Sequence, residues 1–310
     1  AHGNSKNLVG SGVSTAFSHQ PKALFVFADC CMLIADSWFM GGELNTINLK
    51  TIYDRHSRHP AVHALNDPVV FIRRYREDRD REIAGFLASQ FAYGKRETFR
   101  TFLEKLFALM GESPFSFIKA GDFSGVRGLY YRFQKDKDIV LLLQILQRII
   151  DEFGNIGAML RYFYRGDIRE ALWAAREHLF RNGNELTFFF PKPSSTNPMK
   201  RWSLYLRWMV RKDAIDIGIW GFIDKRALIV PLDTHIFKIC RCAGWTQQKT
   251  QSYKAACEIT DALKRFSPDD PLKYDLFLCH AIGIGAGAQA KGRLPAKTGA
   301  CFTELYKGSR

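Results

Sequence analysis

The sequence predicts an all-α protein, and three features of the chain favour that class. From about residue 43 onwards, apolar residues recur with the three- and four-residue spacing of one helix face. Alternating apolar and polar runs bounded by hairpin turns, which are typical of half-buried strands, do not stand out. A repeat with a period of roughly 20 to 50 residues, which would indicate a solenoid, is not found either.

The predicted helices follow from this spacing. In residues 83–91 and 99–107 the apolar positions fall at i, i+3, i+4, i+7 and i+8. Residues 139–153 form a longer apolar stripe, and residues 167–180 end before an Asn-Gly pair, as a C-cap requires.

A helix that begins at Lys200 is expected to be buried on nearly all sides. Its sequence, KRWSLYLRWMVR, has apolar residues around the whole circumference and follows PKPSSTNP, a turn rich in capping residues. Further helices are expected from Asp233, from about residue 250 to 266, and from residue 271 to about 282.

Residues 1–42 differ in composition from the rest and are expected to be an N-terminal extension outside the core. A polar stretch is followed by ALFVFADCCMLIADSWF, and we expect Met40 to be the natural start. The apolar stretch contains Asp29 and Asp36 and is shorter than the ~20 residues that a bilayer requires. It therefore predicts neither a membrane helix nor a signal peptide.

The charge balance favours a polyanionic partner. The chain has 45 Lys and Arg against 31 Asp and Glu, which gives a net charge of +14. Residues 200–250 carry ten Lys or Arg against four Asp. Such an excess attracts polyanions and releases their counterions, although charge alone does not choose between DNA, RNA, a ribosome and an anionic membrane.

The cysteines and histidines predict no metal site. Seven cysteines with irregular spacing indicate reduced cytosolic thiols, not a secreted disulfide framework. The eight histidines are scattered, and neither an HExxH motif nor a Cys/His cluster occurs.

Two polar residues stand at expected helix starts. Asp233, in IVPLDTHIFKIC, would accept bonds from unpaired backbone N–H groups, so capping alone would explain it. The alternative is a carboxylate that acts on a neighbouring group. Two interpretations are likewise open for Lys200. It is either a solvated surface lysine or a nucleophilic amine beside the positive end of a helix. A helix start of this kind can also bind a phosphate.

Two segments resemble the helix-hairpin-helix DNA glycosylases, the superfamily that contains endonuclease III. PLDTHIFKICRCAGW is similar to the segment with their catalytic aspartate, and EIAGFLASQFAYGKRETFRTFLEKLF is similar to their early helix. The 33 positions from Lys200 to Asp233 resemble the spacing in the archaeal 8-oxoguanine glycosylases. From about Glu43 to Ile284 the chain also resembles a bacterial family of uncharacterised conserved proteins, with the blocks FLASxxAYGxR, KRWxxxLRWMVR and PLDTHxxxI.

The resemblance implies a two-lobed helical fold with the active site in the cleft between the lobes. One lobe would comprise residues 43–80 and 216–310, including a flexible C-terminal tail. The other would comprise residues 81–215 and end in the element that resembles the helix-hairpin-helix. Two features of the family are missing: SSTNPMKR replaces the hairpin L-P-G-[VI]-G, and the four-cysteine loop is absent. We therefore expect no iron–sulfur cluster and no other cofactor.

The function that the resemblance implies is base-excision repair. The enzyme would remove an oxidised purine, with 8-oxoguanine the preferred candidate, through a Schiff base of Lys200 assisted by Asp233, and would then cleave the strand as an AP lyase. Two alternatives stay open: a monofunctional glycosylase in which Asp233 activates water, and a nucleic-acid-binding protein without catalysis. The partner would be double-stranded DNA with a damaged base, bound by a monomer in the cytoplasm at the bacterial nucleoid.

The resemblance also suggests groups that contact a flipped base. Gln90 takes the position of a glutamine that these enzymes insert into the duplex, although a hydrogen-bonded core amide would fit its apolar stripe equally well. Four aromatic residues are candidates for a base pocket or, alternatively, for core packing: Trp202, Tyr205, Trp208 and Trp220.

Further polar residues are candidates for the site or for the DNA backbone. Asp216 is either a second acid or a turn residue, and His235 is either part of the site or bonded to backbone at the helix start. The expected phosphate contacts, which position DNA without reading its sequence, are Arg201, Arg207, Arg211, Lys238 and Arg241.

Overall fold

The regular secondary structure is helical in the part of the chain that the structure, a computed structural model, describes. This confirms the predicted all-α class. In that part, extended segments pair only in two isolated bridges, Tyr131 with Gln134 and Lys212 with Ile217. None of its helices is both long and apolar enough to cross a bilayer. The described residues are 50, 53–54, 67–181, 183 and 186–279, so the predicted extension at 1–42 lies outside them.

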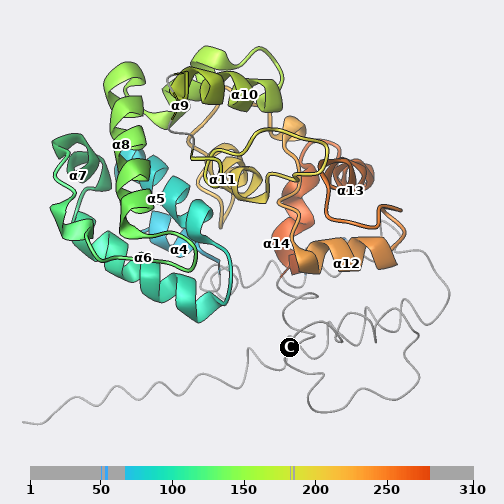
Figure 1. Cartoon of the computed structure of the whole chain (residues 1–310). Helices are drawn as coiled ribbons and strands as arrows, with labels where there is room; N and C mark the ends of the chain where they lie inside the picture. The colour runs from blue at the N-terminus through green and yellow to red at the C-terminus, as the bar shows by residue number, and fades with distance from the viewer. Residues whose placement is uncertain (1–49, 51–52, 55–66, 182, 184–185, 280–310) are drawn as a thin grey trace, which may run out of the picture.

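Helices α4 to α8 form one side of the molecule (Figure 1). α5 (Asp78–Phe91) contacts α4 (Val69–Ile72), α6 (Arg96–Met110) and α7 (Pro114–Ala120). α8 (Asp136–Phe153) packs on α7 and on α9 (Ile156–Phe163), and the short 3-10 helix η1 (Ser124–Val126) contacts α6 and α8. α9 in turn packs against α10 (Ile168–Leu179).

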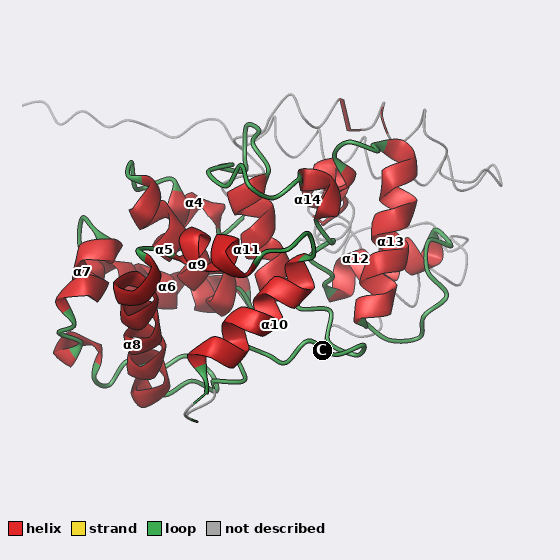
Figure 2. Ribbon diagram, turned by 90° about the horizontal axis from the view of Figure 1, so that it is seen from above, coloured by secondary structure: helices red, strands yellow, loops and turns green. Residues whose placement is uncertain are grey.

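The last helices gather on the opposite side, and α11 (Lys200–Val210) lies between the two groups in both views (Figures 1 and 2). The second group consists of α12 (Thr234–Cys242), α13 (Tyr253–Phe266), the 3-10 helix η3 (Pro271–Tyr274) and α14 (Asp275–Phe277). A further 3-10 helix, η2 (Lys225–Ala227), precedes α12. Residues far apart in sequence therefore meet around α11.

α11 is buried on nearly all sides, as its sequence predicts. Tyr205 and Trp208 have no exposed surface. α11 packs against α5 at Gly85, where an added Cβ would lie only 2.9 Å from Met209 Cε. A fully buried large apolar side chain contributes roughly 1.5–3 kcal/mol to the free energy of unfolding. Packing therefore holds α11, and the residues on it, in a fixed position.

Three of the described helices begin at capping residues of the same kind. Asn155, Asp167 and Ser252 precede α9, α10 and α13, and the side chain of each accepts a hydrogen bond from a backbone N–H three residues later. The starts of these three helices thus have a local cause, and α9 was not predicted from the sequence.

Of the two boundaries expected between the lobes, one falls inside a helix and the other falls in a turn. The one between residues 80 and 81 lies inside α5, which is continuous from Asp78 to Phe91. The one between residues 215 and 216 lies in the turn after α11, where both N–H groups donate to Asp213. Before α11, residues 186–199 form turns and extended segments, not a tight hairpin.

Candidate functional site

Lys200 is the first residue of α11, so its amine lies at a helix N-terminus. Met199 before it adopts a left-handed conformation with φ 52°, which turns the chain sharply into the helix. The preceding turn is held by side chains, because Asn197 accepts a bond from the Met199 N–H at 2.9 Å and Ser194 accepts one from the Asn197 N–H at 3.2 Å. The Lys200 side chain is 36% exposed.

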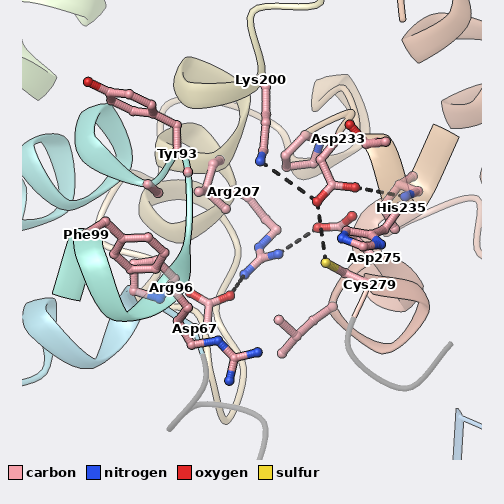
Figure 3. A pocket seen from close by; sticks show the side chains of 18 residues that line it. Asp67, Tyr93, Arg96, Phe99, Lys200, Arg207, Asp233, His235, Asp275 and Cys279 are labelled. Atoms are coloured by element: carbon pink, nitrogen blue, oxygen red, sulfur yellow. Dashed lines mark hydrogen bonds and ion pairs between the residues drawn. The ribbon is translucent and has the colours of Figure 1, made fainter. Parts of the chain in front are cut away.

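Asp233 caps α12 with one oxygen and faces Lys200 with the other. Its Oδ1 accepts a hydrogen bond from the Ile236 N–H at 2.8 Å. Its Oδ2 lies 3.8 Å from Lys200 Nζ and 3.7 Å from Cys279 Sγ, and the side chain is only 16% exposed (Figure 3). Capping and a role in a site are therefore compatible, because they use different atoms of one carboxylate.

The two residues line one pocket with a volume of about 490 Å³ (Figure 3). The segment from the end of α5 to the start of α6 contributes Tyr93, Arg96 and Phe99, while α12 and α14 contribute the facing side. From α11, Leu204 and Arg207 follow Lys200 at the spacing of one helix face. The pocket therefore lies where both groups of helices meet the start of α11.

Arg207 is a fixed cation in the wall of this pocket. Its guanidinium donates to Asp275 at 2.6 Å, to Asp67 at 3.1 Å and to Asp216 at 3.3 Å, and none of the four side chains is more than 4% exposed. Burial opposes its charge, but the three carboxylates outweigh burial and raise the pKa of Arg207. Burial also raises the pKa of Asp216 to about 6, against the two guanidinium groups beside it.

The family model for proteins of unknown function named DUF2400 matches residues 67–284. The chain belongs to this family. The matched segment includes every residue that lines the pocket, from Asp67 to Cys279. No curated protein and no solved structure matched the chain.

A second pocket of the DUF2400 chain, of about 260 Å³, adjoins the first at Lys200 and Tyr93, which line both. Phe188 and Trp202, together with Tyr93, contribute aromatic side chains to its wall. Trp202 is buried, and its indole N–H donates to the Phe189 carbonyl at 2.9 Å. Trp202 is thus a core residue that also borders a concave surface beside the amine.

The prediction of phosphate contacts is wrong for Arg207 and Arg211, because both guanidinium groups are buried. Arg211 is 6% exposed and donates to Asp270 at 2.7 and 2.9 Å and to Asp216. Asp213 lies 3.0 Å from the same guanidinium. Carboxylates neutralise these two positive charges inside the protein, and they come both from the same segment and from distant parts of the chain.

Arg201 is half-buried and lines the smaller pocket, and its contact with phosphate stays a prediction. The guanidinium donates to the Phe188 carbonyl, donates to the Gln90 carbonyl at 3.4 Å, and lies 3.8 Å from the centroid of the Phe188 ring. Burial lowers the pKa of Arg201 to about 10. Its cation supports the wall of the smaller pocket.

Two predicted base contacts are also wrong because the side chains are in the core. Gln90 has no exposed surface, and its amide nitrogen donates to Ser89 Oγ at 3.3 Å. Trp220 is buried, and its indole N–H donates to Glu82 at 2.7 Å. Neither lines a pocket beside Lys200, and the buried Tyr205 likewise serves the core.

The remaining predicted contacts lie on α12. His235 is exposed and lines the larger pocket, Arg241 is exposed, and Lys238 is half-buried. Their contacts with DNA stay predictions. Asp216, a candidate second acid, lies in the buried ion-pair network and does not line the larger pocket.

Several pocket residues were missed by the sequence analysis. Tyr93 and Arg96 lie in the block FLASxxAYGxR, so their position in a shared block could have identified them. Asp67, Asp275 and Cys279 carry no local signal, because their role depends on contacts with distant segments.

A turn beside the pockets, residues 130–134, exposes two aromatic side chains. Tyr131 and Gln134 exchange two backbone hydrogen bonds of 2.9 Å, and Tyr130 and Phe133 are 75% and 70% exposed. The turn is attached to the pocket wall, since the Tyr93 hydroxyl donates to the Gln134 side chain and the Tyr131 hydroxyl donates to the Tyr93 carbonyl. We call these residues the aromatic turn.

Proposed function

We propose that this protein is a DNA glycosylase with AP lyase activity, which acts on an oxidised purine such as 8-oxoguanine. The observation that carries the proposal is the Lys200 amine 3.8 Å from the Asp233 carboxylate, in a pocket at the start of a buried helix. An amine beside a fixed carboxylate is the pair that this chemistry needs. The family resemblance and the basic composition favour DNA as the substrate.

The chemistry uses both residues in order. The neutral Lys200 amine attacks C1′ of the damaged nucleoside as the bond from C1′ to the purine nitrogen breaks, and the departing purine takes up the proton that the amine loses through Asp233. Asp233 stabilises the positive charge that develops on the sugar and accepts the amine proton. Ring opening gives an imine, and loss of a C2′ proton then expels the 3′ phosphate.

The pocket arrangement supports a two-lobed enzyme with its active site between the lobes. The segment from the end of α5 to the start of α6 contributes one wall, α12 and α14 contribute the other, and α11 links them. The adjoining aromatic pocket is suited to a flipped base, because it lies next to the amine that would attack the sugar.

The aromatic turn is suited to contact the disturbed duplex, in place of the buried Gln90. Tyr130 and Phe133 offer faces on which bases stack. Arg127, Arg132 and Lys135 are exposed in and beside the turn and can approach phosphates.

The test is a panel of duplexes with single lesions and with an abasic site, assayed for base release, strand cleavage and borohydride trapping. Lys200→Gln is expected to abolish trapping while DNA affinity persists. Lys249→Gln removes the same charge at an exposed position outside the pockets and serves as the matched control. Undiminished trapping in Lys200→Gln would exclude this lysine as the nucleophile.

A second candidate is a monofunctional glycosylase, which the ion pair itself favours. A lysine paired with a carboxylate at 3.8 Å can remain charged and contact phosphate while Asp233 activates water. In that case the protein releases a base without any covalent trapping. Failure to release a base from every lesion, together with salt-dependent binding, would instead indicate a non-catalytic nucleic-acid-binding protein.

A further inference from the structure

The short segment 275–279 contacts both elements that carry the proposed site. Asp275 accepts a hydrogen bond from Arg207 on α11 at 2.6 Å. Cys279 donates from Sγ to Asp233, the cap of α12, at 3.7 Å. The two residues are four positions apart in a helical segment, so their side chains lie on the same face. One face of this segment therefore connects α11 to the start of α12.

Cys279 and Lys200 approach the same atom of Asp233 (Figure 3). Oδ2 lies 3.7 Å from the thiol sulfur and 3.8 Å from the amine nitrogen, while Oδ1 accepts the Ile236 N–H at 2.8 Å. The cap bond holds one oxygen, and the thiol bond holds the other. Together they fix the plane of the carboxylate relative to the amine.

The thiol can serve only as a donor in this position. Burial raises the pKa of Cys279 well above its usual range. The carboxylates of Asp233, Asp275 and Asp67 raise it further, and Lys200 acts in the opposite direction. The thiol therefore stays protonated near neutral pH, so it is a neutral donor and not a competing nucleophile.

We propose that Cys279 is a positioning residue that holds the Asp233 carboxylate toward the Lys200 amine. The ion pair between Asp275 and Arg207 fixes the segment from which the thiol reaches Asp233. The effect on catalysis rests on the proposed function. The contact between Cys279 and Asp233 does not depend on any substrate. Its loss would let the carboxylate turn away from the amine without removing either reacting group.

The catalytic consequence is tested by borohydride trapping on a duplex with an abasic site, which needs no lesion recognition. Cys279→Ala is expected to slow trapping roughly tenfold at unchanged DNA affinity, because a misplacement of about 1 Å can cost up to about 100-fold in rate. Cys279→Ser keeps a donor and is expected to restore most of the rate. Equal rates in Cys279→Ala and the wild type, or no rescue by serine, would overturn the proposal.

A thiol titration tests the contact without DNA. The rate of iodoacetamide alkylation at Cys279 is measured against pH by peptide mass spectrometry, in the wild type and in Asp233→Asn, which keeps a capping side chain. Removal of the Asp233 charge is expected to lower the pH midpoint of alkylation at Cys279. Cys257, half-buried on α13 and lining neither pocket beside Lys200, is the internal control and should not shift.

The two experiments separate the possible failures. An unchanged midpoint at Cys279 would overturn the contact even if the wild type traps an abasic site. A lowered midpoint in a protein that traps no DNA would support the contact between Cys279 and Asp233 and would reject the Schiff-base chemistry proposed for Lys200.

Discussion

Replacement of Arg207 by methionine is expected to lower the free energy of unfolding by about 4 kcal/mol, because it leaves buried carboxylates without their cation. Methionine keeps an unbranched apolar chain of similar reach. The guanidinium that is lost donates to Asp67, Asp216 and Asp275, none of them more than 4% exposed.

The magnitude follows from what each carboxylate retains. Loss of one partner of a buried ion pair costs about 3–5 kcal/mol. Three such costs do not add, since Asp216 keeps Arg211 and Asp67 keeps the Val69 N–H at 2.9 Å. A carboxylate left unpaired can also take up a proton, which limits the decrease in the free energy of unfolding. The expected value therefore stays within the range for a single broken pair.

The assay is urea unfolding followed by circular dichroism. With a slope of about 2 kcal/mol per molar urea, a loss of about 4 kcal/mol lowers the midpoint by about 2 M. Arg241→Met, at an exposed position on α12, is the matched control and should stay within about 0.5 kcal/mol of the wild type. An unchanged midpoint for Arg207→Met, with weaker DNA binding and a smaller salt dependence, would refute the buried role and restore the phosphate contact.

Three further substitutions have defined outcomes. Trp220→Phe should lower the free energy of unfolding by about 2 kcal/mol, since Glu82 loses its 2.7 Å indole donor while buried. Gly218→Ala should cost about 1–3 kcal/mol in the same unfolding assay, because φ is 64° and the new Cβ would meet the Arg211 carbonyl at 2.8 Å. Phe133→Ala should weaken binding to abasic-site DNA by about 1–3 kcal/mol in a fluorescence titration and leave unfolding unchanged.

Each of these has a matched control. Trp173→Phe and Gly221→Ala alter a partly exposed tryptophan and a glycine with open space around its Cβ position, so little change in unfolding is expected. Tyr162→Ala removes a 63% exposed aromatic side chain on α9. If Tyr162→Ala weakened DNA binding as much as Phe133→Ala, the aromatic turn would have no special role in binding.

The sequence by itself determined the helical class and the positions of most helices in the described residues. Helix periodicity and capping are local properties, so the pattern in residues 200–211 predicted the burial of α11 correctly. The same local rules placed Lys200 and Asp233 at two helix starts. The family resemblance, which local rules do not supply, suggested that the two residues act together.

Only the tertiary structure decided which charged and aromatic side chains face inward. Arg207 looks like a surface cation in its own helix, and it is buried because Asp67 and Asp275 come from segments 140 and 68 positions away. Trp220 and Glu82 are 138 positions apart, and Cys279 and Asp233 are 46 apart. A buried charge or donor is stable only with a partner, and the partner is chosen by packing between distant segments, which no local pattern records.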